Sequence, residues 1–116
     1  MGQIPIKQRE LLLVPFPFSD QSGRKIRPVI VISNDAFNET SDDVIAVGVT
    51  SNMSRDKYTI LLTPNNLDEG KLFSRCSIKV ENILKLDKSL IIKKIGLVNN
   101  EILKNIASTL FSIVKS

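Results

Sequence analysis

Short apolar runs rich in valine, isoleucine and leucine, separated by polar segments, occupy most of the chain. Runs of this length with many β-branched residues, bounded by turn-forming residues, are typical of β-strands. We expect strands over residues 11–16, 28–33, 44–51, 58–63, 74–82 and 91–95. The prolines of the PFPF stretch suit a sheet edge or a strand end, because proline has no N–H to donate. Residues 64–70 favour a loop or short turn, and residues 34–43 form a polar connection.

The pattern changes after residue 98. Asn99 or Asn100 can cap a helix there, and Glu101 favours its first turn electrostatically. Many short strands followed by one helix predict a single domain over residues 1–116, mostly β in class (α+β). We expect the helix to cover the open side of a small, strongly bent, barrel-like sheet. The apolar side chains that recur at helical intervals of three and four are Ile102, Leu103, Ile106, Ala107, Leu110, Ile113 and Val114.

Charge is distributed unevenly along the 116 residues. The formal net charge of +4 divides into −2 over residues 1–70 and +6 over residues 71–116. A basic second half is compatible with a nucleic-acid partner, although lysine-rich faces are more often simply solvated. The single cysteine, Cys76, allows no internal disulfide and fits a reducing compartment. No apolar run has the length of a membrane span and no cleavable signal is evident, so we expect a cytoplasmic protein.

The sequence contains no histidine, which excludes nucleophiles activated by histidine and the paired-imidazole route to RNA cleavage. One cysteine and no histidine also make a zinc site improbable, and the five glycines form no phosphate-binding loop. We therefore expect neither a metal nor a cofactor. Any catalysis must use arginine, lysine, carboxylates or hydroxyl groups.

Arg27 stands directly before Pro28, at the start of an apolar strand. A residue before proline is restricted to extended geometry, so only the side chain of Arg27 remains to be ordered. Pairing Ser33 with Val44 in an antiparallel arrangement places Arg27 opposite Thr50, with Cβ atoms about 5 Å apart. By itself this arginine fits a hydrated strand edge better than a phosphate-binding site.

The expected pairing brings a cation and a hydroxyl to the end of the sheet where the polar loop 19–26 also arrives. Thr50 shares its strand face with Ala46 and Gly48, whose small size leaves a hollow unless Gly48 forms a bulge. An arginine, a Thr-Ser pair and a basic loop make a plausible phosphodiester site. RNA supplies its own nucleophile in the 2′-OH, so such a site must stabilise charge and manage protons without histidine or metal.

Four blocks in this order resemble the MazF/PemK toxins of toxin–antitoxin systems: LLLVPFPFSD, GRKIRPVIVISND, DVIAVGVTSN, and SIKVENILKLDKSLIIKKIG followed by a helix. The resemblance covers roughly residues 10–114. It implies a small SH3-like twisted β-barrel with a C-terminal helix and a homodimeric assembly. It also implies a metal-independent, sequence-selective endoribonuclease that cuts single-stranded mRNA, leaving 2′,3′-cyclic phosphate and 5′-OH ends. The implied partner is an antitoxin whose flexible acidic tail occupies the RNA groove.

The resemblance also assigns residues. Arg27 matches the family's catalytic arginine and Thr50 its catalytic threonine, with Ser51 or its backbone N–H assisting. Arg75 is a further candidate for the groove, and Phe16 and Phe18 offer a stacking surface unless they belong to the core or to a dimer contact. The predicted RNA-contacting residues are Asp20, Ser22, Arg24, Lys25, Ser77 and Lys79.

The sequence departs from the family pattern at two places. The loop before Arg27 is short and lacks the glutamate found in several members, which leaves Asp20 as the candidate base. The Gly-Asp pair that usually precedes the first strand is replaced by Arg9 and Glu10. Two non-nuclease interpretations stay open: a gyrase poison of the related CcdB type, and an RNA-binding or regulatory module that binds RNA without cutting it.

Overall fold

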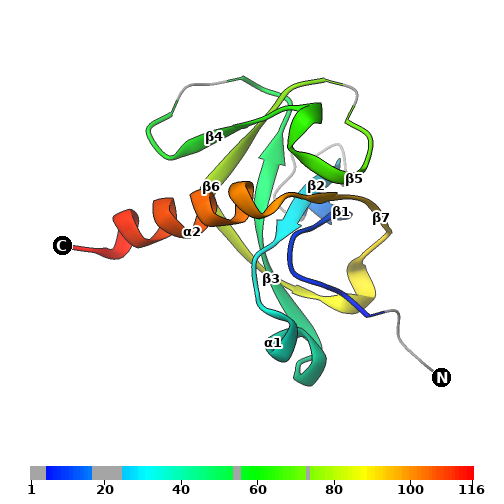
Figure 1. Cartoon of the computed structure of the whole chain (residues 1–116). Helices are drawn as coiled ribbons and strands as arrows, with labels where there is room; N and C mark the ends of the chain where they lie inside the picture. The colour runs from blue at the N-terminus through cyan, green and yellow to red at the C-terminus, as the bar shows by residue number, and fades with distance from the viewer. Residues whose placement is uncertain (1–4, 17–24, 54–55, 73) are drawn as a thin grey trace.

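The computed structural model describes residues 5–16, 25–53, 56–72 and 74–116 (Figure 1). Two α-helices and seven strands lie in these segments, with two short 3₁₀ turns, Pro64–Asn66 and Lys88–Leu90. The elements are β1 (Glu10–Phe16), β2 (Lys25–Val31), α1 (Asp35–Thr40), β3 (Asp43–Thr50), β4 (Thr59–Leu62), β5 (Leu67–Gly70), β6 (Cys76–Asp87), β7 (Lys93–Val98) and α2 (Asn100–Val114).

The seven strands form one antiparallel sheet in the order β4-β6-β3-β2-β1-β7-β5. The sheet curls into a half-barrel, and α2 lies across β6 and β4, with its C-terminal half extending past the sheet (Figure 1). This confirms the expected class, mostly β with a C-terminal helix on one side of a bent sheet. Neither helix of the described residues has the length and hydropathy needed to cross a membrane.

The central strands are buried on both faces. On the face covered by α2, here called the helix face, Leu11, Ile30, Val47 and Ile78 join Ile102 and Ile106 of the helix in one core cluster. On the opposite or far face, a second cluster contains Leu12, Val14, Val29, Val31, Val44, Ala46 and Leu86. Alternate residues of a strand point to opposite faces, so burial on both sides explains why these strands are almost continuous apolar runs.

The predicted register of β2 against β3 is confirmed over three pairs. Val29 lies opposite Gly48, Ile30 opposite Val47, and Val31 opposite Ala46. These pairs follow the same offset as the expected pairing of Ser33 with Val44. The ladder itself ends at Val31, because the N–H groups of Ile32 and Ser33 both donate to the carbonyl of Ile45.

Strand β6 is longer than the sequence pattern indicated, running over 76–87 in place of 74–82. An irregularity allows it to continue: Val47 pairs with Ile83, whereas the next residue, Gly48, pairs with Lys79. Residues 80–82 of β6 are thus extra relative to β3. Extra residues in one strand of a pair form a β-bulge, which bends the strand and increases its twist. The polar Glu81 and Asn82 fall in this bulge, which is why the sequence appeared to end the strand there.

Two elements were missed by the sequence prediction. The connection 34–43 contains helix α1, whose first turn is capped by the Asn34 side chain accepting from the N–H of Phe37. Asn38 of this helix is buried and exchanges hydrogen bonds with Ser33, so a polar residue anchors the helix to the sheet. The expected loop at 64–70 contains a 3₁₀ turn and then β5, which pairs with β7. For α2, the cap is Asn99, which accepts from the N–H of Ile102.

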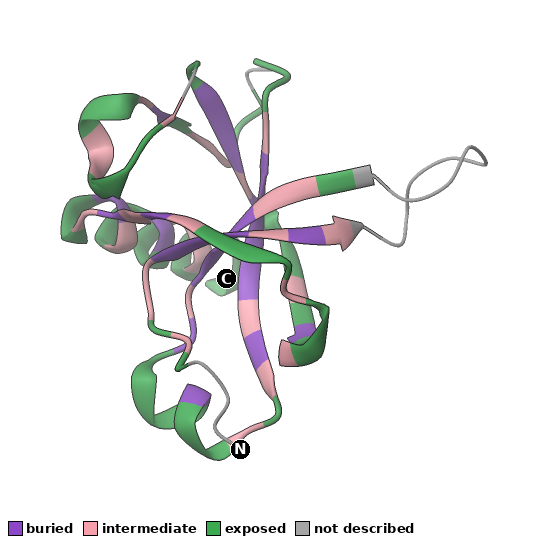
Figure 2. Cartoon of the chain, turned by 90° about the vertical axis from the view of Figure 1, so that its right-hand side faces the viewer, coloured by how far each residue is buried: buried purple, intermediate pink, exposed green. Residues whose placement is uncertain are grey.

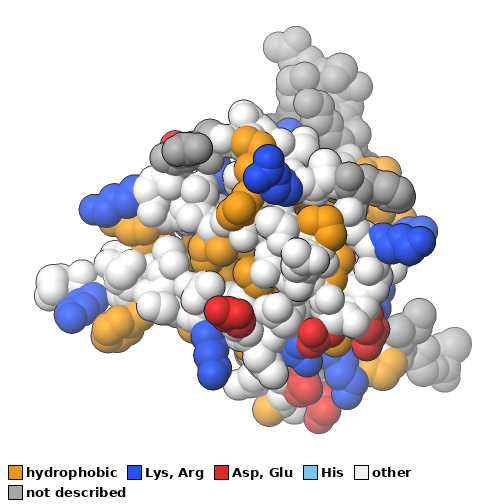
Figure 3. Space-filling view, turned by 45° about the horizontal axis from the view of Figure 1, so that its top comes forward, with side chains coloured by type: hydrophobic (Ala, Val, Ile, Leu, Met, Phe, Trp, Pro, Cys, Tyr) orange, Lys and Arg blue, Asp and Glu red, His pale blue; other side chains and the backbone are white. Residues whose placement is uncertain are grey.

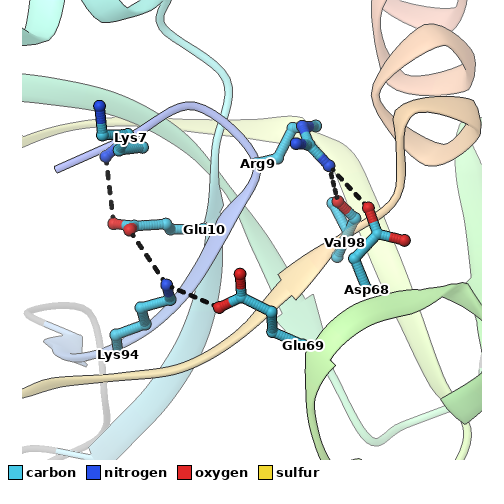
Figure 4. A network of polar contacts seen from close by, with 7 residues as sticks. All are labelled: Lys7, Arg9, Glu10, Asp68, Glu69, Lys94 and Val98. Carbon is cyan, nitrogen blue, oxygen red and sulfur yellow. Dashed lines mark hydrogen bonds and ion pairs between the residues drawn. The ribbon is translucent and has the colours of Figure 1, made fainter.

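A polar network joins the start of β1 to the end of β7 (Figure 4). The Arg9 guanidinium donates to the carbonyl of Val98 at 2.7 Å and to Asp68 at 3.1 Å. Lys94 lies between the carboxylates of Glu10 and Glu69, at 3.4 and 3.1 Å. Arg9 has a φ of 81°, a left-handed conformation that glycine adopts without cost. This left-handed position is therefore occupied by an arginine, and a single terminal nitrogen of its guanidinium donates both hydrogen bonds.

Gly70 should be irreplaceable for the close approach of β5 to β7. Its φ is +87°, and a Cβ atom there would lie 2.2 Å from the carbonyl oxygen of Ile95. Gly70→Ala is expected to lower the free energy of unfolding by at least about 1–2 kcal/mol from the backbone conformation alone, before the clash is counted. Urea denaturation measures this change. Ser108→Ala, at an exposed position of α2, should shift stability by less than about 0.5 kcal/mol, and equal effects of the two changes would contradict the assignment.

Candidate nucleic-acid interface

The described candidate residues of β2, β3 and β6 share the far face of the sheet. Arg27 lies an even number of residues from Val29 and Val31, and Thr50 from Val44 and Ala46, so both share the face of these members of the far-face cluster. On β6, Ser77 and Lys79 alternate with Cys76, Ile78 and Val80, which belong to the helix-face cluster. The sequence therefore directs all four polar side chains to one side of the sheet.

Strand pairing sets these side chains in two neighbouring rows. The first row crosses five strands through the pairs of Leu12 with Val29, Val29 with Gly48, Gly48 with Lys79, and Lys79 with Thr59. The second row lies two residues further along each strand, about 7 Å from the first. In it, Val14 of β1 pairs with Arg27 of β2. Ser77 of β6 pairs with Thr50 of β3 on one side and with Leu61 of β4 on the other. We call Arg27, Gly48, Thr50, Ser77 and Lys79 the far-face patch.

The predicted contact between Arg27 and Thr50 lies just beyond the β2–β3 ladder. Its last pair is Val29 with Gly48, so Arg27 and Thr50 are the next residues on the same face of each strand. From this point β2 pairs with β1 alone, and the β1–β2 hairpin extends away from the rest of the sheet (Figure 2). Exposure rises accordingly along β2, from Ile30 at 0% to Ile26 at 58%. Arg27 is half-buried at the base of this extension.

Thr50 ends β3 and begins a tight turn. Its hydroxyl accepts a hydrogen bond from the backbone N–H of Asn52 at 3.1 Å, which fixes the side chain toward the turn. A hydroxyl that accepts one hydrogen bond still has its own proton to donate. Ser51 is exposed in the same turn. Ser77, directly opposite Thr50, is buried, and its hydroxyl contacts the sulfur of Met53 at 3.8 Å.

Lys79 forms an ion pair with Asp56. The hydrogen bond to Asp56 is the main reason that the pKa of Lys79 lies above its ordinary value, with smaller attractions from Asp56 and Glu81 partly offset by desolvation. Lys79 is therefore a permanent cation at neutral pH and cannot accept a proton from a substrate. Asp56 is the patch neighbour that sequence reasoning missed, because only the fold brings it to Lys79.

The structure describes some of the other predicted site residues. Asp20, Ser22 and Arg24 lie outside the described residues, and so does Phe18. Lys25 and Phe16 are described only as a backbone pair that closes the β1–β2 ladder. Arg75 is exposed immediately before β6.

Other features of the surface help to locate the chemistry. Within segments 5–16, 25–53, 56–72 and 74–116, no three histidine, cysteine or acidic residues are grouped so that they can hold a metal ion. Figure 3 shows most of the visible acidic side chains gathered in one area, with lysine and arginine side chains both among them and scattered over the rest of the view. A cavity of about 300 Å³ lies elsewhere, between the N-terminal segment, Leu12, Ile91 and Lys94. It contains none of the predicted site residues, and Lys94 is already paired with two carboxylates there.

Several solved structures have the same fold as this chain. The MazF structure from Deinococcus radiodurans matches with a TM-score of 0.79 at 17% identity, over 98% of this chain and 100% of that chain. An endoribonuclease from a mycobacterial species, solved with its cognate antitoxin, matches with a TM-score of 0.74 at 19% identity over 92% of each chain. A MazE–MazF complex from Deinococcus radiodurans gives 0.75 at 19% identity, over 96% and 97%. No curated protein matches the chain significantly in sequence.

At these identities the solved structures establish the fold, and the family follows from the sequence itself. The model of the PemK-like, MazF-like toxins of type II toxin–antitoxin systems matches residues 7–114. That range includes every strand and helix described above and every residue of the far-face patch. The chain therefore belongs to the PemK-like, MazF-like toxins of type II toxin–antitoxin systems.

Proposed function

We propose that this toxin is a metal-independent, sequence-selective endoribonuclease that cuts single-stranded mRNA in the cytoplasm. The observation that carries the proposal is the far-face patch, where strand pairing aligns Thr50 with Ser77 and sets Arg27 on the same face at the next position of β2. Membership of the toxin family supports it, as do neighbours of the same fold that are themselves endoribonucleases.

In the proposed reaction the 2′-OH of the substrate attacks the adjacent phosphorus atom, and the P–O5′ bond breaks. The products are a 2′,3′-cyclic phosphate and a 5′-hydroxyl. Arg27 contacts the scissile phosphate, offsets the charge that develops on its oxygens, and relays a proton to the departing 5′-oxygen. Its guanidinium presents a planar fork of donors that matches two phosphate oxygens, and its restricted backbone before Pro28 lowers the cost of ordering it.

The Thr50 hydroxyl donates a hydrogen bond to a non-bridging phosphate oxygen, and the Ser51 side chain or its backbone N–H assists. The turn that fixes Thr50 through Asn52 supplies the preorganisation that such a donor needs. Ser77 and Lys79 line the groove beside them, and Arg24 and Lys25 grip flanking phosphates from the β1–β2 hairpin. Asp20 and Ser22 contact RNA from the same loop, with Asp20 the candidate base.

Removing the donors one at a time tests these roles. Thr50→Val should lower the rate of RNA cleavage about 10²–10³-fold, because it deletes one preorganised donor, whereas Thr50→Ser should retain most activity. Arg27→Ala should lose more than Arg27→Lys, since lysine keeps the charge without the fork. Cleavage of a long single-stranded RNA gives the rates, with circular dichroism confirming folding.

Lys104→Ala supplies the matched control for loss of a positive charge. Lys104 is exposed on α2, away from the patch, and its loss should leave cleavage within about twofold. Full activity of Arg27→Ala would sink the assignment of the reaction to this patch. Absence of cleavage by the unaltered protein, with arrest of gyrase supercoiling, would instead favour a CcdB-like poison.

The chemistry of the product ends gives an independent check. Because the substrate supplies the nucleophile, we expect cleavage to proceed undiminished in EDTA. We also expect 5′ ends that a kinase can phosphorylate without prior phosphatase treatment, and 3′ ends that resist ligation until the cyclic phosphate is removed. Sequencing the 5′ ends would give the recognised motif. Inhibition by EDTA that magnesium reverses, or 5′-phosphate ends, would contradict the proposed reaction.

The proposed partners are a second copy of the chain and an antitoxin with a flexible acidic tail. Neighbours of the same fold have been solved with their cognate antitoxins. Large apolar side chains exposed on the described surface, including Ile83 at 51%, Phe111 at 63% and Val114 at 77%, support further contacts. Light scattering should give twice the chain mass of 12.9 kDa, and a mass of one chain at micromolar concentration would contradict the homodimer.

A further inference from the structure

The ion pair between Lys79 and Asp56 lies inside the far-face patch. Lys79 stands opposite Gly48, the position with no side chain, and two residues from Ser77 and its partner Thr50. Its side chain is only 21% exposed, whereas that of Asp56 is 53% exposed. The lysine is therefore the less exposed partner of the ion pair, and the carboxylate is the one more open to solvent.

Asp56 is held in place by main-chain contacts as well as by its charge. Its carbonyl accepts hydrogen bonds from the N–H of Thr59 at 3.2 Å and from the Thr59 hydroxyl at 2.9 Å. Thr59 is also the strand neighbour of Lys79 on β4. Thr59 thus pairs with Lys79 on β6 and also holds the backbone of Asp56. The start of β4 therefore positions both partners of the ion pair.

We propose that Asp56 competes with substrate phosphate for the ammonium group of Lys79 and is therefore a selectivity-determining residue of this toxin. This inference rests on the proposed function, in which Lys79 lines the RNA groove. A carboxylate and a phosphate present the same kind of anionic oxygen to an ammonium group. A phosphate that approaches Lys79 must displace Asp56 or share the lysine with it against like-charge repulsion. Asp56 therefore weakens the binding of any polyanion that does not also satisfy the rest of the patch.

The effect is separable from the chemistry by a substrate that cannot react. The probe is a single-stranded 2′-O-methyl RNA oligonucleotide of mixed sequence, whose blocked 2′-oxygen cannot attack phosphorus. Its affinity for the full chain is measured by fluorescence anisotropy across a range of salt concentrations. The proteins compared are the unaltered chain, Asp56→Asn, Lys79→Met and the double variant.

Asp56→Asn should bind the probe about three- to tenfold more tightly. Its affinity should also fall more steeply with salt, by about 0.7 in the slope of log K against log[salt], because one more phosphate is neutralised by a freed lysine. Lys79→Met should weaken binding in the otherwise unaltered chain, because it removes the cation that offsets the charge of Asp56 in the groove. In the Asp56→Asn background, Lys79→Met should abolish the gain.

Asp68→Asn is the matched control. Asp68 also pairs with a cation, Arg9, and its side chain is 52% exposed, but it lies at the β5 end of the sheet. It removes the same charge and should raise affinity by less than twofold. Equal gains from Asp56→Asn and Asp68→Asn would overturn the proposal, as would a gain that survives in the double variant or an absence of binding by every variant.

Cleavage of unmodified RNA, measured separately, distinguishes failure of the proposed reaction from failure of the proposed role of Asp56. If the unaltered chain binds the probe with the predicted pattern and cuts no RNA, the proposed reaction fails and the role of Asp56 stands. If it cuts RNA and Asp56→Asn leaves affinity unchanged, the role of Asp56 fails alone. Thermal unfolding should differ little between the variants, because an ion pair with a partner as exposed as Asp56 contributes little to stability.

Discussion

The far-face patch depends on one constraint: the register of β2, β3 and β6. Because neighbouring residues of a strand point to opposite faces, a slip of one residue would carry Arg27, Thr50 or Ser77 to the face that α2 covers. Burial on both sides prevents the slip, since a shifted strand would have to exchange the whole of one apolar cluster for the other. The polar patch is thus positioned by apolar side chains that take no part in it.

The bulge in β6 is the second element of this arrangement. On one side of it β6 pairs with β3 beside Val47 and Ala46, and on the other it pairs beside Gly48 and Thr50. Without the extra residues, Lys79 would not stand opposite Gly48. The irregularity that lengthens the strand also brings a cation to the one position of β3 that has no side chain, and bulges are often found beside functional sites for this reason.

Much of the fold followed from the sequence, because strong apolar runs and a helical period report burial directly. The β2–β3 register could be predicted for the same reason: two runs of β-branched residues with one polar connection leave few alternatives. Helix α1 could not, since its sequence is polar and its anchor is Asn38, a buried amide whose partners appear only after the sheet forms. Asp56 was invisible in the same way, because nothing in its local sequence indicates the lysine that it meets. The resemblance to a family supplied the site residues, whereas the loop that carries Asp20, Ser22 and Arg24 stays a prediction.

The contact between Arg9 and Val98 also affects the order in which the protein folds during synthesis. These residues are 89 positions apart, and they close the pairing of the first strand with the last. Closing a loop of this length has a high entropic cost and slows folding. Because a ribosome releases the chain from its N-terminus, β1 pairs with β7 only after the strands between them have emerged. The strands that set the register of the far-face patch, β2, β3 and β6, all precede β7 in the chain, so the patch is able to form before the sheet closes on β1.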